Sequence, residues 1–197
     1  MFSKINPASR MLVAAAFVVL CISQVSRGFP LPQQSAIDLD GKPVDLFKTA
    51  PGKITVLVFI RTDCPISNRY APLLQRMSET YISEAKFWLV YPDRKTTPQE
   101  IRTHLEQFHY KIAALRDPNR SLVKLGKATI TPEAVVFDSQ AHLLYHGRID
   151  NWYEDASRAR PAATTHELQN AIEAAIDGKP SPVATSNAVG CYISDLE

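Results

Sequence analysis

The stretch Ile54-Thr-Val-Leu-Val-Phe-Ile-Arg-Thr-Asp-Cys-Pro-Ile-Ser67 decides the fold, because it passes from a strand pattern to a helix pattern through a cysteine. Residues 54–60 are almost wholly apolar and rich in β-branched side chains, which is typical of a strand covered on both faces. Pro65 suits the first turn of a helix, and Pro72 predicts a kink in it. One face of this helix carries Ile66, Tyr70, Leu73 and Met77. The sequence therefore predicts a buried strand and a kinked helix, with Cys64 at their junction.

Further strands and helices alternate on both sides of this junction. A hairpin is predicted at 36–47, strands at 86–91, 134–137 and 143–149, a short helix at 121–125, and longer helices after the capping-box patterns Thr97-Pro-Gln-Glu100 and Thr164-Thr-His-Glu167. Strands separated by helices need crossover connections and therefore pair in parallel, whereas the last two strands form an antiparallel hairpin. This order predicts an α/β fold with one mixed sheet, helices on both of its faces, and no second domain.

Cys64 is the residue of this pattern that carries chemistry. A helix N-terminus presents unpaired N–H groups and a partial positive charge, which lower the pKa of a cysteine placed there. Arg61 and Arg69 add positive potential, Asp63 works against it, and the Ser67 hydroxyl is placed to donate a hydrogen bond to the sulfur. The pattern favours a nucleophilic Cys64, and the alternative is a buried, inert cysteine.

Residues 1–27 have the pattern of an export signal. Lys4 and Arg10 precede the apolar run 11–22, which suits the core of a signal peptide and falls short of the ~20 residues of a membrane span. Beyond residue 27 the chain has 19 basic and 20 acidic residues, a balance that gives no electrostatic reason to bind nucleic acid. We expect an exported protein, periplasmic or extracellular, that contacts a membrane only if residues 11–22 remain as an uncleaved tether.

The elements together resemble the thioredoxin superfamily, and more narrowly its redoxin branch of thiol-specific antioxidant proteins and exported thiol–disulfide oxidoreductases. The resemblance rests on residues 59–67 after a buried strand, the kinked helix, Thr131-Pro132 before a hairpin, and the closing helix, and it covers about residues 35–178. It implies a three-layer thioredoxin-like fold in which Cys64 attacks the substrate. It also implies that Pro132 is a cis-proline and that the Thr131 backbone faces the substrate disulfide.

The active-site motif departs from the pattern of these relatives. Ser67 stands where a Cys-x-x-Cys pair has its second cysteine, so dithiol exchange within the motif is impossible. Thr62 lies two residues before Cys64, whereas peroxidase relatives resemble Thr-x-x-Cys. Those relatives also have a distant arginine near the peroxide, for which Arg148 is either a substitute or merely a solvated hairpin residue.

A nucleophilic Cys64 without a partner in its motif needs another thiol to release its product. Cys191 is the only other cysteine after residue 27, and it lies on a Pro-, Ser- and Thr-rich tail that looks extended and flexible. Cys191 either resolves a mixed disulfide or a sulfenic acid on Cys64, or forms a permanent disulfide with Cys64 or with another protein. An external thiol is the alternative resolving group.

Copper handling is a further alternative. Copper-carrying relatives resemble Cys-x-x-x-Cys with a distant histidine, but Asn68 stands in the fourth position after the cysteine. His142 and His146 are too far apart along a strand to share one ion, and His104 and His109 are expected on a helix surface. We expect no metal and no other cofactor.

The sequence thus predicts a signal peptide at 1–27, a redoxin domain at 28–178, and a tail at 179–197 that carries Cys191. The acidic and aromatic stretch 150–155 is expected to be a solvated loop packed by its aromatic side chains. The favoured function is a thiol-dependent oxidoreductase acting on a protein or small-molecule disulfide or on a peroxide, with an external thiol as reductant. The alternative class is a non-catalytic thioredoxin-like interaction module.

Overall fold

The computed structural model describes residues 36–49 and 52–193, so the predicted signal peptide lies outside the described residues. The strands are β1 (Ala36–Ile37), β2 (Pro43–Val44), β3 (Ile54–Phe59), β4 (Ala85–Tyr91), β5 (Ala113–Arg116), β6 (Ile130–Thr131), β7 (Glu133–Phe137), β8 (Leu143–Gly147), β9 (Tyr153–Asp155), β10 (Arg158–Ala159) and β11 (Cys191–Tyr192). The helices are α1 (Leu46–Thr49), α2 (Pro65–Arg69), α3 (Ala71–Thr80), α4 (Pro98–Gln107), α5 (Ser121–Gly126) and α6 (Glu167–Ile176).

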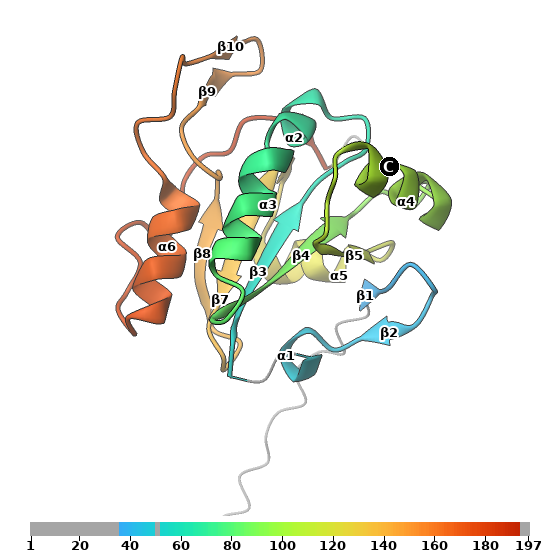
Figure 1. The fold of residues 1–197 in the computed structure, drawn as a ribbon, viewed down its shortest axis with the longest axis horizontal. Coiled ribbons are helices and arrows are strands. Elements are labelled where there is room, and N and C mark those ends of the chain that lie inside the picture. Colours follow the sequence, from blue (N-terminus) through green and yellow to red (C-terminus); the bar gives the residue numbers. More distant parts are fainter. Residues whose placement is uncertain (1–35, 50–51, 194–197) are drawn as a thin grey trace, which may run out of the picture. The chain divides into compact units, whose positions relative to one another are not determined.

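A seven-stranded sheet in the order β2-β1-β5-β4-β3-β7-β8 forms the centre of residues 36–193 (Figure 1). β3, β4 and β5 are parallel, as crossover connections require. The β1–β2 and β7–β8 hairpins are antiparallel, and β7 pairs antiparallel with β3. The predicted α/β fold with a mixed sheet is confirmed.

The alternating side chains of β3 divide the core into two layers. Val56 and Val58 belong to a cluster with the apolar faces of α2, α3, α4 and α6. Leu57 and Phe59 belong to a second cluster on the other face, with apolar residues of α1 and α5. Helices therefore cover both faces of the sheet, and this double burial explains why β3 is apolar throughout rather than alternating.

The helix after Cys64 is broken at the predicted place. α2 ends at Arg69 and α3 begins at Ala71, with Tyr70 between them. Pro72 has no N–H to donate into the preceding turn, and its ring disfavours a continuous helix there. The break leaves α2 as a short, separate element that carries the residues after Cys64.

Two local predictions are wrong or incomplete. Strand β5 has no signal in the sequence, because Ala113-Ala-Leu-Arg116 lacks β-branched and aromatic residues, and it forms along the edge that β4 offers. The capping box of α4 is present with both of its hydrogen bonds, but the one predicted for α6 is absent. The Thr164 hydroxyl accepts a hydrogen bond from Asn151 instead, and Glu167 is bound to Arg148.

Within the described residues, no helix is both long enough and apolar enough to cross a membrane.

Candidate functional site

Cys64 lies directly before the first residue of α2, at the end of the loop that leaves β3. Its exposed fraction is 0%. Its thiol donates a hydrogen bond to the carbonyl oxygen of Thr131, with a sulfur–oxygen distance of 3.2 Å. The fold therefore brings together the two positions that the resemblance assigned to the cysteine and to the residue before the proline.

The peptide bond between Thr131 and Pro132 is cis, as the resemblance implied. The next residue, Glu133, is buried, and one of its carboxylate oxygens accepts hydrogen bonds from the backbone N–H groups of Thr129 and Ile130 at 2.8 and 3.2 Å. These bonds fix the loop that leads into the proline. The only sequence signal for this role is a carboxylate at the start of an apolar strand, which must find donors if it is buried.

The C-terminal tail is docked on this loop and is not free. β11 pairs antiparallel with β6, which sets Cys191 opposite Thr131 and Tyr192 opposite Ile130. The Thr131 hydroxyl donates to the carbonyl oxygen of Cys191 at 3.3 Å. The flexible tail expected from its composition is therefore wrong for this segment, because backbone pairing holds it regardless of side-chain pattern.

This docking sets the two sulfur atoms of Cys64 and Cys191 3.0 Å apart. Both cysteines are free thiols, and Cys191 donates to Cys64. Burial raises the pKa of the Cys64 thiol, but hydrogen bonds from Ser67 and Cys191 outweigh it, so that the pKa lies below its ordinary value. Burial, the hydrogen bond to Cys64 and the negative charge of Cys64 together raise the pKa of Cys191 to about 11. Cys64 is thus the thiol that ionises first.

Ser67 lies on α2, one turn after Cys64, and is buried. Its hydroxyl oxygen has no hydrogen-bond partner of good geometry. The lowered pKa of Cys64 nevertheless depends on this hydroxyl, because an ionised sulfur offers it an acceptor.

A buried histidine connects α2 to α4 and β4, although the sequence led us to expect it on a helix surface. His104 has one ring nitrogen 2.9 Å from the Tyr91 hydroxyl and the other 2.8 Å from the side-chain oxygen of Asn68. Asn68 in turn donates to the backbone carbonyl of Thr62, two residues before Cys64. The expectation fails because His104 follows Ile101 by three residues and shares its buried face. His109 is exposed, as expected.

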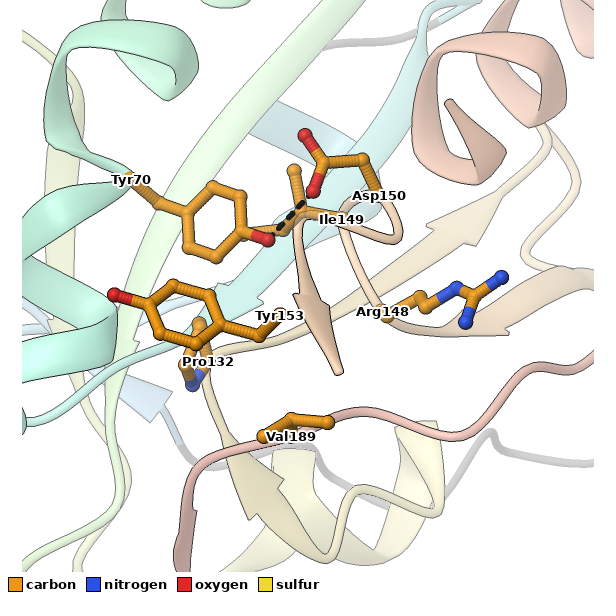
Figure 2. A pocket seen from close by; sticks show the side chains of 7 residues that line it. All are labelled: Tyr70, Pro132, Arg148, Ile149, Asp150, Tyr153 and Val189. Carbon is orange, nitrogen blue, oxygen red and sulfur yellow. Dashed lines mark hydrogen bonds between the residues drawn. The ribbon is translucent and has the colours of Figure 1, made fainter. Parts of the chain in front are cut away.

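A small hollow lies beside the cis-proline (Figure 2). Its lining residues are Tyr70, Pro132, Arg148, Ile149, Asp150, Tyr153 and Val189. The Tyr70 hydroxyl donates to the Asp150 carboxylate at 2.6 Å, and Asp150 is buried. The expected solvated loop at 150–155 is therefore wrong, because Asp150, Asn151 and Tyr153 are buried and residues 153–155 form β9. The expected packing of its aromatic side chains is present, since the rings of Tyr70, Trp152 and Tyr153 lie together.

The basic residues around the site are engaged with neighbouring groups. Arg61 makes a bidentate ion pair with Asp63 at 2.9 and 2.7 Å. Arg69 lies over the ring of Trp152, and Arg148 is bound to Glu167. Because Arg148 lines the hollow, it is more than a solvated hairpin residue, but its charge is already compensated by Glu167.

The two histidines of the β8 region have separate partners. His142 lies 2.9 Å from a carboxylate oxygen of Asp138, and His146 lies 3.5 Å from one of Glu133. Among the described residues, no group of three or more His, Cys, Asp and Glu side chains is arranged to hold a metal ion.

Solved structures with the same fold include proteins from several organisms. A hypothetical protein from Sinorhizobium meliloti matches with a TM-score of 0.66 and 21% identity, over 80% of this chain and 88% of its own. An uncharacterized conserved protein from Geobacillus kaustophilus matches with a TM-score of 0.66 and 23% identity, over 85% and 93%. A secreted disulfide oxidoreductase of Mycobacterium tuberculosis matches with a TM-score of 0.50 and 16% identity, over 74% and 96%. At these identities the likeness concerns the fold.

Sequence comparison gives a family assignment. No curated protein matches the chain. The model of the AhpC/TSA family, however, matches residues 27–146. This match spans more than half of the sequence and includes Cys64 and the cis-proline, in the fold described above. The chain therefore belongs to the AhpC/TSA family, within the redoxin branch of thioredoxin-like proteins.

Proposed function

We propose that this chain is an exported thiol-dependent oxidoreductase in which Cys64 is the nucleophile and Cys191 is the resolving thiol. The observation that carries the proposal is the 3.0 Å separation of the two sulfur atoms beside cis-Pro132. Membership of the AhpC/TSA family supports thiol chemistry in general. The fold shared with a secreted disulfide oxidoreductase of Mycobacterium tuberculosis agrees with it.

The different pKa values of the two thiols support a fixed order of action. A thiolate is the attacking form, and the pKa of Cys64 is the lowered one. Cys191 is held protonated partly by the charge of ionised Cys64 and by the hydrogen bond to it. Once Cys64 is bound in a disulfide, it carries no charge and both of these causes disappear. Cys191 then becomes easier to ionise at the moment when its attack is needed.

The reaction with a disulfide takes two exchanges. The Cys64 thiolate attacks one sulfur of the substrate disulfide, forms a mixed disulfide, and releases the other sulfur as a thiolate. The Cys191 thiolate then attacks the sulfur of Cys64, which forms the Cys64–Cys191 disulfide and releases the second substrate thiol. Two electrons have passed to the substrate, and an external thiol must return them to Cys64 and Cys191. With a peroxide, the first product is instead a sulfenic acid on Cys64 and an alcohol or water.

The experiment that tests the proposal compares the native chain with the Cys191→Ser and Cys64→Ser variants. Each reduced protein is treated with oxidised glutathione or hydrogen peroxide, and the products are identified by mass spectrometry. We expect an internal Cys64–Cys191 disulfide in the native chain. In Cys191→Ser we expect a trapped glutathione adduct, or a sulfenic acid, on Cys64. Cys64→Ser should form no internal disulfide, and its remaining thiol still has burial, the largest cause of its raised pKa, acting against ionisation.

The outcomes separate the alternatives. A glutathione adduct without a sulfenic acid favours disulfide exchange. A sulfenic acid without a glutathione adduct favours peroxide reduction. A native chain in which Cys64 and Cys191 never pair contradicts the resolving role. If Cys64 forms no adduct of either kind, a non-catalytic interaction module is the better account. Tight Cu(I) binding that depends on Cys64 and accompanies no thiol exchange favours copper handling.

The proposal includes the predicted organisation of the chain. Residues 1–27 are a signal peptide, 28–178 the redoxin domain, and 179–197 a tail that supplies the second thiol. N-terminal sequencing of the mature protein after expression and cell fractionation checks this. A mature chain that begins near residue 24–28 outside the cytoplasm is expected, whereas an intact N-terminus in a membrane fraction indicates a tether at residues 11–22.

A further inference from the structure

The tail lies against the cis-proline loop and places the sulfur of Cys191 directly beside that of Cys64. Cys64 has an exposed fraction of 0%, and the sulfur next to its own is that of Cys191. Beyond β11, the Ile193 N–H donates to the Thr129 carbonyl at 2.9 Å, which extends the pairing along the loop. A substrate sulfur that takes the place of the Cys191 sulfur must therefore displace this part of the tail. This step rests on the proposed function, because it takes Cys64 as the reacting group.

The residue before Cys191 is held to glycine by backbone contact. A Cβ atom on Gly190 would lie 2.0 Å from the carbonyl oxygen and 2.7 Å from the carbonyl carbon of Thr131. The same carbonyl oxygen of Thr131 also accepts the hydrogen bond from the Cys64 thiol. In this register, the residue before the cysteine that pairs with Thr131 must therefore be glycine.

The residues two places away on each side are apolar and packed. Ile193 has an exposed fraction of 3% and belongs to the core cluster on the α5 face of the sheet. Val189 packs against the other core cluster and forms one wall of the hollow beside Pro132 (Figure 2). Tyr192 lies between these positions in sequence and is 57% exposed. The site therefore selects for shape at three positions and tolerates any residue directly after the cysteine.

We propose that the tail occupies the docking site of an outside protein partner and displays the partner's sequence pattern. The partner presents an extended segment of the form aliphatic-Gly-Cys-any-aliphatic, which replaces residues 189–193 as a strand on β6. Its cysteine, held in a disulfide, then lies where Cys191 lies now. The Cys64 thiolate attacks that sulfur, a Cys64–partner disulfide forms, and the partner's former disulfide mate leaves as a thiolate.

The test uses the full-length chain with Cys21 replaced by serine, and synthetic peptides. In the Cys191→Ser variant Cys64 is the only cysteine beyond residue 27, and adding Gly190→Ala drives the tail out of its site. The probe is the six-residue peptide with the sequence of residues 188–193, its cysteine linked by a disulfide to 5-thio-2-nitrobenzoate. Attack by Cys64 releases the coloured thiolate. Matched peptides carry alanine for the glycine, or serine for the isoleucine, and reaction with free glutathione corrects for intrinsic reactivity.

We expect the glycine peptide to react at least about tenfold faster than the alanine peptide, which corresponds to ~1.4 kcal/mol. The serine peptide should also be slower, and Cys64→Ser in the same background should release no coloured thiolate beyond that of the peptide alone. If Gly190→Ala impairs folding, the same peptide ratios are measured in Cys191→Ser alone, where every peptide competes with the same tail.

Two results overturn the inference while leaving the proposed function intact. Equal rates for the glycine and alanine peptides mean that Cys64 accepts any disulfide. No peptide reaction at all, in a chain whose native form makes the Cys64–Cys191 disulfide, means that the tail is the only strand the site accepts. Failure of the native chain to form that disulfide is a different result, and it overturns the proposed function itself.

Discussion

Cys64 and Cys191 have the same side chain, and their surroundings give them opposite properties. Burial raises the pKa of both thiols, as it must for a group that becomes negatively charged. Cys64 accepts the hydrogen bond between them, Cys191 donates it, and the nearby Ser67 hydroxyl lowers the pKa of Cys64 only. When this pair loses its first proton, the negative charge forms on Cys64 and the remaining proton stays on Cys191. The macroscopic titration belongs to the pair.

Replacing Ser67 with alanine removes one of the two donors that lower the pKa of Cys64. In the Cys191→Ser background, Ser67→Ala should therefore raise the pKa of Cys64 and reduce the thiolate fraction at neutral pH. The ultraviolet absorbance of the thiolate, followed against pH, measures this without a reagent having to enter the site. Ser78→Ala is a matched control, because that hydroxyl bonds to the Gln75 carbonyl within α3. Identical titrations for Ser67→Ala and Ser78→Ala would show that Ser67 does not act on the sulfur.

His104 predicts a loss of stability in acid. Burial lowers the pKa of His104 below its ordinary 6.5, so the unfolded chain takes up the proton more readily than the folded one. Its contribution to stability is thus fully present above pH 6.5 and is lost as the pH falls through the lower folded value. His104→Asn should flatten this part of the pH dependence and cost ~1–3 kcal/mol at neutral pH, because polar partners lose their geometry.

Urea unfolding at a series of pH values measures both effects. His109→Asn is the control, because His109 is exposed and has a positive φ, which asparagine tolerates. It should leave the stability and its pH dependence nearly unchanged. If His104→Asn keeps the full acid sensitivity, His104 is not the group that loses its folded-state advantage in acid.

At the scale of elements, the sequence predicts the helices and strands that are determined by residues close to one another in the chain. β3, the break at Tyr70, the α4 capping box and the β7–β8 hairpin follow from apolar runs, proline and turn chemistry within a few residues. β5 and β11 form because another strand offers them an edge; the residues of β5 carry little strand propensity, and β11 is only two residues long. Backbone pairing of this kind leaves no periodic side-chain pattern, so the docked tail could not be predicted. The one sequence feature that fits the docked tail is the glycine at position 190, where the structure leaves no room for a side chain.

The tail is anchored to β8 at a second crowded glycine. Gly147 has a φ of +150°, and a Cβ on it would lie 2.4 Å from the backbone oxygen of Ser186. The Ser186 hydroxyl is bonded to the Tyr145 hydroxyl and to the Arg148 N–H at 2.7 and 3.1 Å. Gly147→Ala should therefore loosen the tail, expose Cys64 to alkylation and slow formation of the Cys64–Cys191 disulfide.

The alkylation rate of Cys64 in the native and Gly147→Ala chains checks this at one pH, with the modified residue identified by peptide mapping. Gly178→Ala is the matched control, since Gly178 also has a positive φ but a Cβ there would meet no atom within 4 Å. It should strain the end of α6 without exposing Cys64. Equal alkylation of Cys64 in both variants would mean that the β8 anchor does not hold the tail over the site.

At the scale of the whole molecule, the candidate site is assembled from three distant parts of the chain. Cys64 and the cis-proline could be predicted together, because the order of strands and helices resembles a family whose topology joins those two positions. The position of Cys191 could not be predicted, because it depends on pairing with Thr131, which lies 60 residues earlier in the chain. His104 and Glu133 were missed for a related reason, since burial of a single polar residue depends on its partners across the fold.

Oxidation should make the whole molecule more stable. A Cys64–Cys191 disulfide closes a loop across 127 residues, which restricts the unfolded chain far more than the folded one, where the sulfurs are already 3.0 Å apart. We expect oxidation to raise the free energy of unfolding by about 2–4 kcal/mol. Guanidinium unfolding with and without a reducing agent measures the difference, and Cys191→Ser, which cannot form the bridge, should be insensitive to the reductant. A native chain that is less stable when oxidised would mean that closing the disulfide strains the docked tail, so that the reduced pair is the form that the fold favours.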